Sequence, residues 1–198
     1  MKLAIIRQKY SAFGGAERFI ERLLPGLAQQ NIDVSLIARK WSGDSASPMH
    51  WVPCDPFYIG SAWRDKAFAK AACRAVAAGD FDLVQSHERL SCCDIFRAGD
   101  GVHAAWLEAR QNYLGESLTW LSLNPFHANS LAAERRMFAS PRLKKVICIS
   151  NMVREDVQRL YQVPDQKLVT IYNGINKDAF CPQSAKTRHQ MRESLKIP

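Results

Sequence analysis

The chain has 198 residues, of which 47% are hydrophobic and 23% are charged, and this composition is typical of a folded globular protein and excludes a disordered one. Its 27 Lys and Arg residues outnumber 19 Asp and Glu residues, giving a net charge of +8. An anionic partner is therefore expected, such as a phosphosugar, a nucleic acid or an acidic membrane surface. The basic residues are dispersed and no RNP-like aromatic motif is present, which argues against nucleic acid.

The first thirty residues predict a strand, a glycine turn and a helix. Ile5 and Ile6 lie in a continuous aliphatic run that is typical of a central strand in a parallel sheet. After Gly14 and Gly15, apolar residues repeat at helical spacing as far as Gln30. Glycine lets the backbone approach a ligand, and the free amides of a helix N-terminus attract negative charge. The turn predicts an anion site, although it matches neither the dinucleotide fingerprint nor a P-loop, and a tight turn without a ligand is the alternative.

The next segments continue the alternation of strands and helices. Residues 33–38 predict a second strand, and residues 61–78 predict an alanine-rich helix capped by Ser61. The charged residues of that helix are basic apart from Asp65. A solvated outer face is favoured for it over contact with an acidic surface.

Two loops in the middle of the chain carry polar, titratable residues. Strands are predicted over residues 81–86 and 94–98, followed by His87, Glu88 and Arg89 in the first case and by residues 99–103 in the second. Ligands of open α/β sheets bind at the carboxyl ends of the strands. These loops and the glycine turn are expected to form one cleft.

The rest of the chain predicts further helices and strands. Residues 114–123 are apolar without a clean period, and packing beneath the next helix is slightly favoured over membrane contact through Trp120 and Leu121. Asn124 and Pro125 predict a helix start. The remaining elements are helices over 104–113, 124–138, 150–161 and 186–195, and strands over 145–149 and 168–172.

The six cysteines show no C-x-x-C spacing, and Cys148 lies in an apolar strand. This pattern favours reduced thiols over a disulfide framework or a zinc site. The N-terminus shows no signal-peptide core, and no apolar run approaches membrane-spanning length. A cytoplasmic protein, soluble or peripheral on a membrane, is expected.

Short aliphatic strands that alternate with helices predict an α/β fold with a Rossmann-like, doubly wound and mainly parallel sheet. Such a sheet carries helices on both faces. The residues alone lead to an anion-binding cleft in this fold.

Four motifs, in order and spacing, resemble the N-terminal domain of the retaining GT-B glycosyltransferases of family 4. They are FGGAER at 13–18, GDGVH at 99–103, VICIS at 146–150 and IYNGIN at 171–176, followed by Phe180 and Pro182. The first loop is most similar to that of lipopolysaccharide-core α-glucosyltransferases, which transfer glucose to a heptose. The resemblance implies that residues 1–198 are the acceptor-side half of a GT-B fold, ending at the interdomain linker, with the C-terminal donor-binding domain absent.

The resemblance also implies the chemistry. It implies a nucleotide-diphosphate-sugar donor, with a UDP-sugar expected, a glycan or glycolipid acceptor, and no metal or other cofactor. Gly14 and Gly15 would approach the donor diphosphate, His103 would contact the transferred sugar, and Asp100 would orient the acceptor. Ser150, Asn173 and Gly174 correspond to positions that border the interdomain cleft. The full-length protein is expected to be a hexosyltransferase in lipopolysaccharide or other cell-surface polysaccharide synthesis, and the 198-residue chain alone to be inactive.

Two alternatives stand beside this one. The first is a dinucleotide-dependent Rossmann enzyme, which is disfavoured because the glycine fingerprint is absent and Arg39 and Lys40 follow the second strand where an acidic residue is needed. The second is a non-catalytic module that docks on an anionic membrane through its basic helix and the region of Trp120.

Overall fold

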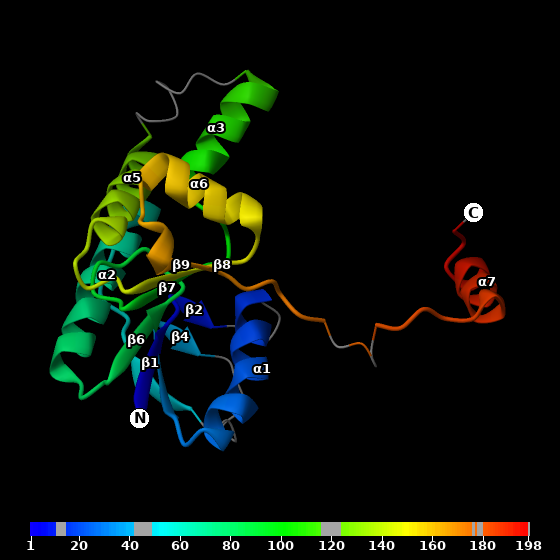
Figure 1. The fold of residues 1–198 in the computed structure, drawn as a ribbon, viewed down its shortest axis with the longest axis horizontal. Coiled ribbons are helices and arrows are strands. Elements are labelled where there is room, and N and C mark those ends of the chain that lie inside the picture. Colours follow the sequence, from blue (N-terminus) through cyan, green and yellow to red (C-terminus); the bar gives the residue numbers. More distant parts are fainter. Residues whose placement is uncertain (11–14, 42–48, 116–123, 176, 178–179, 198) are drawn as a thin grey trace.

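The computed structural model describes residues 1–10, 15–41, 49–115, 124–175, 177 and 180–197, and Figure 1 shows their arrangement. The main strands are β1 (Lys2–Ile6), β3 (Asp33–Ala38), β5 (His50–Pro53), β6 (Leu83–Ser86), β7 (Ile95–Ala98), β8 (Lys145–Cys148) and β9 (Leu168–Thr170). The helices are α1 (Gly15–Gln29), α2 (Gly60–Ala78), α3 (His103–Leu114), α5 (Pro125–Phe138), α6 (Asn151–Tyr161) and α7 (Ala185–Ser194), with a 3-10 turn at Asp165–Lys167. Two short strands, β2 (Lys9–Tyr10) and β4 (Lys40–Trp41), pair with each other.

The seven main strands form one sheet in the order β5-β3-β1-β6-β7-β8-β9, and each neighbouring pair is parallel. From β1 the chain first moves outward to β3 and β5, and then returns past β1 to β6 and the other side. The direction therefore reverses between β1 and β6, at the point of an open sheet where ligands bind beyond the carboxyl ends of the strands. The predicted Rossmann-like, doubly wound parallel sheet is confirmed.

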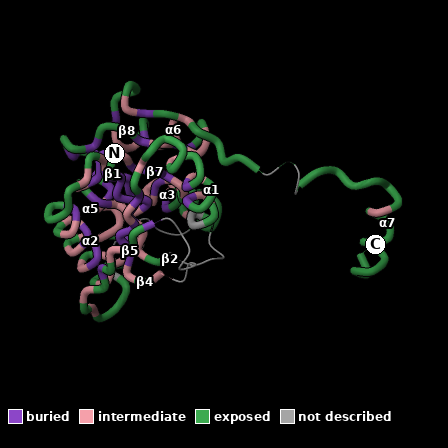
Figure 2. Tube along the Cα trace, turned by 90° about the horizontal axis from the view of Figure 1, so that it is seen from below, coloured by how far each residue is buried: buried purple, intermediate pink, exposed green. Residues whose placement is uncertain are grey.

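Side chains that alternate along the strands supply two cores, one on each face of the sheet. Ile5 packs with Ile20 and Leu24 of α1, whereas its neighbour Ile6 packs on the other face in the cluster that includes Phe68 of α2. Residues of α5 and α6 join that second cluster. Figure 2 shows the buried residues gathered in the body of the domain, while α7 lies apart from it at the end of an extended segment, with none of its residues buried.

Several predicted helix ends are confirmed, and one is wrong. Asn124 caps α5 by accepting a hydrogen bond from the Phe126 amide, and α1 ends at Gln29, one residue before the predicted Gln30. The helix α1 runs on through Pro25. Ser61 does not cap α2, because the helix already begins at Gly60, whose φ of 74° favours glycine at this turn.

The expectation of reduced cysteines is also wrong for one pair. Cys73 of α2 and Cys92 of the loop between β6 and β7 form a disulfide, with their Cα atoms 5.6 Å apart. The packing of α2 against that loop brings them together, and no local spacing in the sequence reveals it. Thiol chemistry therefore gives no support for a cytoplasmic location. In the part of the chain described here, no helix combines the length and the apolar character needed to span a membrane.

Candidate functional site

A hollow of about 500 Å³ lies between the first turns of α1 and the segment that follows β9. Gly15 lines it from α1, and Asn173 and Gly174 line it from the segment. Arg22 joins the two sides, because its Nη1 donates a hydrogen bond to the carbonyl oxygen of Gly174 at 3.1 Å. The structure thus brings together three of the residues predicted for the site, while Gly14 lies outside the described residues.

The N-terminal end of α1 faces open space. A Cβ atom added to Gly15 would meet no atom of the described residues within 4 Å, chain neighbours aside. The backbone amides of a first helical turn lack partners within their own helix, and the helix dipole makes that end favourable for an anion. The hollow therefore has both the room and the donors for a negatively charged group.

Arg97 of β7 lies directly behind the wall of this hollow. Its guanidinium carbon is 3.8 Å from the ring centre of Phe19, and its Nη2 donates to Oδ1 of Asn173 at 2.6 Å. Phe19 and Asn173 both line the hollow. Burial lowers the pKa of Arg97, and the charge of Asp100 opposes that effect. A buried positive charge thus backs the site.

His87 lies on the same side of the sheet and does not offset that charge. Its ring centre is 6.1 Å from that of Phe19, and its Nε2 is 3.2 Å from Nε2 of Gln85. Burial, with further contributions from Arg97 and Arg7, lowers the pKa of His87 to about 3. The imidazole is therefore neutral at pH 7.

His103 begins α3 and lies in an aromatic cluster. Its ring stacks on Trp106 with centroids 5.4 Å apart, meets Phe126 edge-on, and its Nε2 is 3.0 Å from Nδ1 of His127. Burial, and then the charge of Arg89, lowers the pKa of His103 to about 4. This side chain can serve a ligand as a neutral hydrogen-bonding group. It is not among the residues that line the hollow at Gly15.

A buried carboxylate, Glu134 of α5, holds His103 in place. Its exposed fraction is 1%. It accepts hydrogen bonds from the backbone amides of His103 and Ala104, from Nε of Arg89 at 2.8 Å and from the hydroxyl of Tyr161. Burial and this hydrogen bond raise the pKa of Tyr161. Glu134 therefore caps α3 and links it to three other parts of the domain.

The other two predicted site residues lie at the same edge of the sheet. Asp100 is exposed in the turn between β7 and α3, next to Gly101, whose φ of 69° favours glycine. Ser150 is half-buried and caps α6, since its Oγ accepts a hydrogen bond from the Val153 amide at 3.2 Å. The structure records no contact between either residue and the hollow at Gly15.

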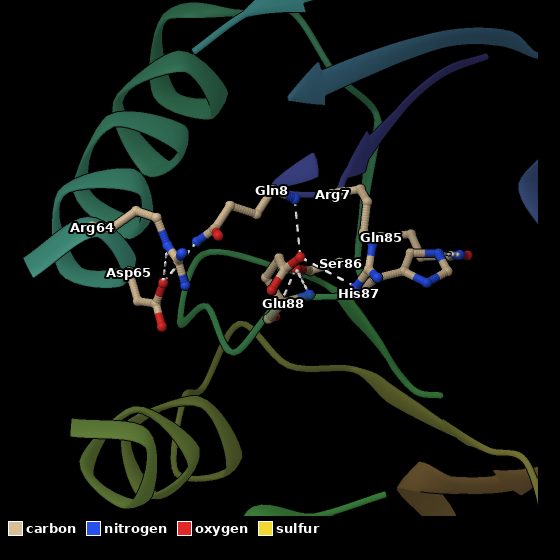
Figure 3. Close-up of polar contacts among 8 residues, drawn as sticks. All are labelled: Arg7, Gln8, Arg64, Asp65, Gln85, Ser86, His87 and Glu88. Carbon is tan, nitrogen blue, oxygen red and sulfur yellow. Dashed lines mark hydrogen bonds and ion pairs between the residues drawn. The ribbon is translucent and has the colours of Figure 1, made fainter. Parts of the chain in front are cut away.

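A second polar cluster connects the end of β1 with the end of β6 (Figure 3). Glu88 accepts a hydrogen bond from the Gln8 amide at 2.9 Å and pairs with Arg7 at 3.3 Å. The side chain of Gln8 reaches Asp65 of α2 at 3.0 Å. Gln8, Asp65 and Glu88 also line a groove of about 700 Å³ that runs between α2 and α5.

No group of three or more His, Cys, Asp or Glu side chains is placed to hold a metal ion within the described ranges. The carboxylates of Glu134 and Glu88 are instead hydrogen-bonded or ion-paired to neighbouring protein groups.

A model of the family described as Glycosyltransferase Family 4 matches residues 13–179. The chain belongs to glycosyltransferase family 4. This family 4 domain is 27% identical over 180 residues to the probable transglycosylase BTH_I0986 of Burkholderia thailandensis (strain E264). The aligned region covers 88% of this chain and 46% of that protein.

The fold is similar to that of solved glycosyltransferase structures. The crystal structure of WaaG, a glycosyltransferase involved in lipopolysaccharide biosynthesis, has a TM-score of 0.80 and 19% identity over 99% of this chain and 52% of its own. The apo form of the lipopolysaccharide outer core galactosyltransferase WaaB has a TM-score of 0.53 and 16% identity over 89% of this chain and 46% of its own. The family 4 domain thus has the fold of a GT-B half and spans about half the length of these proteins.

Two further residues of the candidate site, Arg97 and Glu134, were not predicted, although the sequence around each is informative. Arg97 stands between Phe96 and Ala98 in a four-residue strand that is otherwise apolar. Glu134 shares the inward face of α5 with Met137 and Phe138, three and four positions further on. A charge on an apolar face has to be paired or used, and both positions could have been singled out on that ground.

Replacing Glu134 by Gln should destabilise the domain by roughly 3 kcal/mol, because Arg89 loses a buried partner and the cap of α3 loses its charge. Urea unfolding followed by circular dichroism measures this difference. Glu108→Gln is the matched control. Glu108 pairs with Arg159 on an exposed surface, so its loss should change stability by less than about 1 kcal/mol. Equal effects of the two substitutions would contradict the role given to Glu134.

Proposed function

We propose that this family 4 domain is the acceptor-side half of a retaining hexosyltransferase. The complete enzyme would move a sugar from a nucleotide-diphosphate sugar, with a UDP-sugar as the expected donor, to a glycan or glycolipid acceptor. The observation that carries the proposal is the hollow that Gly15 shares with Asn173 and Gly174, at the carboxyl edge of the sheet and next to a buried positive charge. The lipopolysaccharide roles named for WaaG and WaaB support synthesis of lipopolysaccharide or another surface polysaccharide.

In the proposed reaction the acceptor hydroxyl attacks the sugar on the face from which the diphosphate leaves. Catalysis then requires groups that stabilise the departing phosphate charge. The first amides of α1 at Gly15 would serve this purpose. His103 and Asp100 would orient sugar hydroxyls and would not act as nucleophiles. Ser150 would border the cleft, and no metal or other cofactor would take part.

The proposal requires a second domain that supplies most of the nucleotide site. The domain covers about half of each relative named above, so residues 1–198 alone should not turn over substrate. The enzyme would work at the cytoplasmic face of a membrane, as a soluble or peripheral protein. Family membership argues against the alternative of a dinucleotide-dependent Rossmann enzyme.

Gly15→Val in the full-length protein should weaken UDP-sugar binding at least about tenfold, a change of 1.4 kcal/mol. The valine side chain would fill the space next to the α1 amides, which a Cβ at this position would enter without meeting an atom of the residues that the structure describes. Isothermal titration calorimetry measures the affinity. Gly26→Val is the matched control, because Gly26 lies in the same helix and also has open space. A folded Gly15→Val protein that binds the donor as tightly as wild type would rule out the site.

His103→Ala in the full-length protein should lower kcat by about 10- to 100-fold, because a group that orients the reacting sugar is lost. The wild-type rate should show no loss from His103 protonation between pH 8 and pH 6, since its pKa of about 4 keeps the ring neutral in that range. Turnover assays across this pH range measure both effects. His50→Ala, on the exposed edge strand, is the control. Wild-type turnover by His103→Ala would remove His103 from the site.

A second candidate function, docking on an anionic membrane, is favoured by the groove between α2 and α5. Exposed Lys66, Lys70 and Arg74 line it from α2, and Arg136 lines it from α5. Like charges four residues apart on a helix repel one another, so an anionic surface would relieve that repulsion. The part proposed for Trp120 falls outside the described residues.

The triple variant Lys66→Gln, Lys70→Gln, Arg74→Gln should lose roughly 3 kcal/mol of binding to vesicles that contain phosphatidylglycerol, at about 1 kcal/mol for each cation. Co-sedimentation measures the bound fraction at low and high salt. Vesicles of phosphatidylcholine alone are the control. Equal sedimentation of variant and wild type with the anionic vesicles would exclude the groove as a docking surface.

A further inference from the structure

Arg97 carries a buried charge for which the described residues provide no ion-pair partner. Its exposed fraction is 4%. Across the residues that the structure describes, it forms no ion pair, its Nε has no hydrogen-bond partner, and its Nη2 donates only to the neutral amide oxygen of Asn173. Taking a guanidinium out of water without a paired anion is unfavourable. The contact with the Phe19 ring offsets only a part of this penalty.

Unlike Arg97, the two buried carboxylates among the described residues, Asp94 and Glu134, both have ion-pair partners. Asp94 lies 3.2 Å from the Lys144 ammonium and 3.5 Å from the Arg142 guanidinium. Glu134 pairs with Arg89. In the described part of the chain, both buried acids are therefore paired, whereas the buried Arg97 forms no ion pair with an acid. This contrast indicates that the missing charge belongs to a ligand.

The surroundings of Arg97 are positive. Burial, followed by the charges of Arg97 and Arg7, lowers the pKa of His87 to about 3, so this neighbour is neutral. Asp100 is the acid that acts on Arg97 through space, but it is exposed and forms no ion pair with Arg97 in the described part of the chain. Arg18 and Arg22 line the adjacent hollow.

The chain also makes room for this guanidinium. A Cβ atom at Gly99 would lie 2.5 Å from Nη1 of Arg97, closer than the two atoms can approach. Glycine at this position therefore lets the Arg97 side chain fold back toward Asn173. The backbone at Gly99 therefore accommodates the Arg97 guanidinium, and the buried position of this charge does not result from poor packing.

The bond to Arg97 fixes which way the Asn173 amide points. A guanidinium can only donate hydrogen bonds, so the Asn173 oxygen has to face it. The Asn173 amide nitrogen, with two donors, is left for the hollow that Asn173 lines. Arg97 thus supplies a positive charge from behind and an oriented donor in front.

We propose that Arg97 is a positioning residue for a phosphate-type anion, which it recognises through Asn173 in the hollow at Gly15. The proposal rests on the proposed function and deepens it by naming the group that selects for charge. The phosphate has two conceivable sources, the diphosphate of the donor and a phosphate on the acceptor saccharide. Both present oxygens that match amide donors backed by a guanidinium.

Asn173→Asp tests the proposal, because it supplies the missing carboxylate with almost no change of shape. The variant should unfold at a higher temperature than wild type and should bind UDP at least tenfold more weakly in the full-length protein. Its affinity for uridine, which has no phosphate, should stay within twofold. Asn129→Asp, on α5 and in the other groove, makes the same charge change as a control and should leave UDP binding unchanged.

Arg97→Met and Arg97→Lys separate the charge from the packing. Arg97→Met should lower UDP affinity about as much as Asn173→Asp, and Arg97→Lys should recover part of it. Gly99→Ala keeps the charge and displaces the guanidinium, so it should weaken UDP binding by several-fold even if Arg97→Met does not fold. Arg135→Met, at an exposed position of α5, is the control for overall charge. Unchanged UDP affinity in Asn173→Asp and Gly99→Ala, or an equal loss for uridine, would overturn the proposal.

A second pair of probes identifies the source of the phosphate. Glucose 6-phosphate and glucose are titrated into the same proteins. A loss for UDP alone assigns Arg97 to the donor, and a loss for glucose 6-phosphate alone assigns it to a phosphorylated acceptor; either supports the proposal. If wild type binds UDP-sugar but Asn173→Asp binds every phosphorylated probe as wild type does, Arg97 has no such role while the proposed function stands. If wild type binds no UDP-sugar, the proposed function fails, and a loss of glucose 6-phosphate binding in Asn173→Asp would still support the role of Arg97.

Discussion

One buried carboxylate, Glu134, determines how the second half of the domain is assembled. Its oxygens accept donors from the start of α3, from Arg89 after β6 and from Tyr161 at the end of α6. Each donor would be a costly buried polar group without it, and the carboxylate would be costly without them. The first turn of α3 also presents its positive dipole end to this charge. Because the His103 amide is one of the four donors, the position of His103 follows from the same network.

The two faces of the sheet give its carboxyl edge two different characters. Phe96 and Ala98 of β7 point into the core under α2 and α5, whereas Arg97 between them points to the α1 face. On the α1 face the edge is cationic and suits an anion. At the start of α3 the edge is aromatic and neutral, because His103 is stacked and uncharged. The sugar donor proposed above, with a charged leaving group and a neutral sugar, would present the same two characters side by side.

Local patterns in the sequence predicted most strands of the main sheet, most helix ends and the parallel arrangement, but not the short strands β2 and β4. Apolar runs around Ile5 and Cys148 are long enough to identify buried strands, and the Asn124 and Ser150 caps act within one helical turn. The Cys73–Cys92 disulfide could not be predicted, because it depends on how α2 packs against a loop. The start of α2 was misplaced because Ser61 is a good cap by composition, while the turn at Gly60 is fixed by a positive φ.

The candidate site was predictable only in part, for a related reason. Turn residues such as Gly15, Asn173 and Gly174 can be predicted from their residue type, since glycine and asparagine tolerate the conformations that loops require. Arg97 and Glu134 lie inside a strand and a helix, where each is a single charged residue among apolar ones and no local pattern indicates its role. The structure shows that the two residues differ in their partners. Glu134 is fully satisfied by the protein and serves the fold, whereas Arg97 is satisfied by one neutral amide. Function is expected where the fold does not compensate for a departure from local rules. Among the described residues, Arg97 beside the hollow is a buried charge with no ion-pair partner.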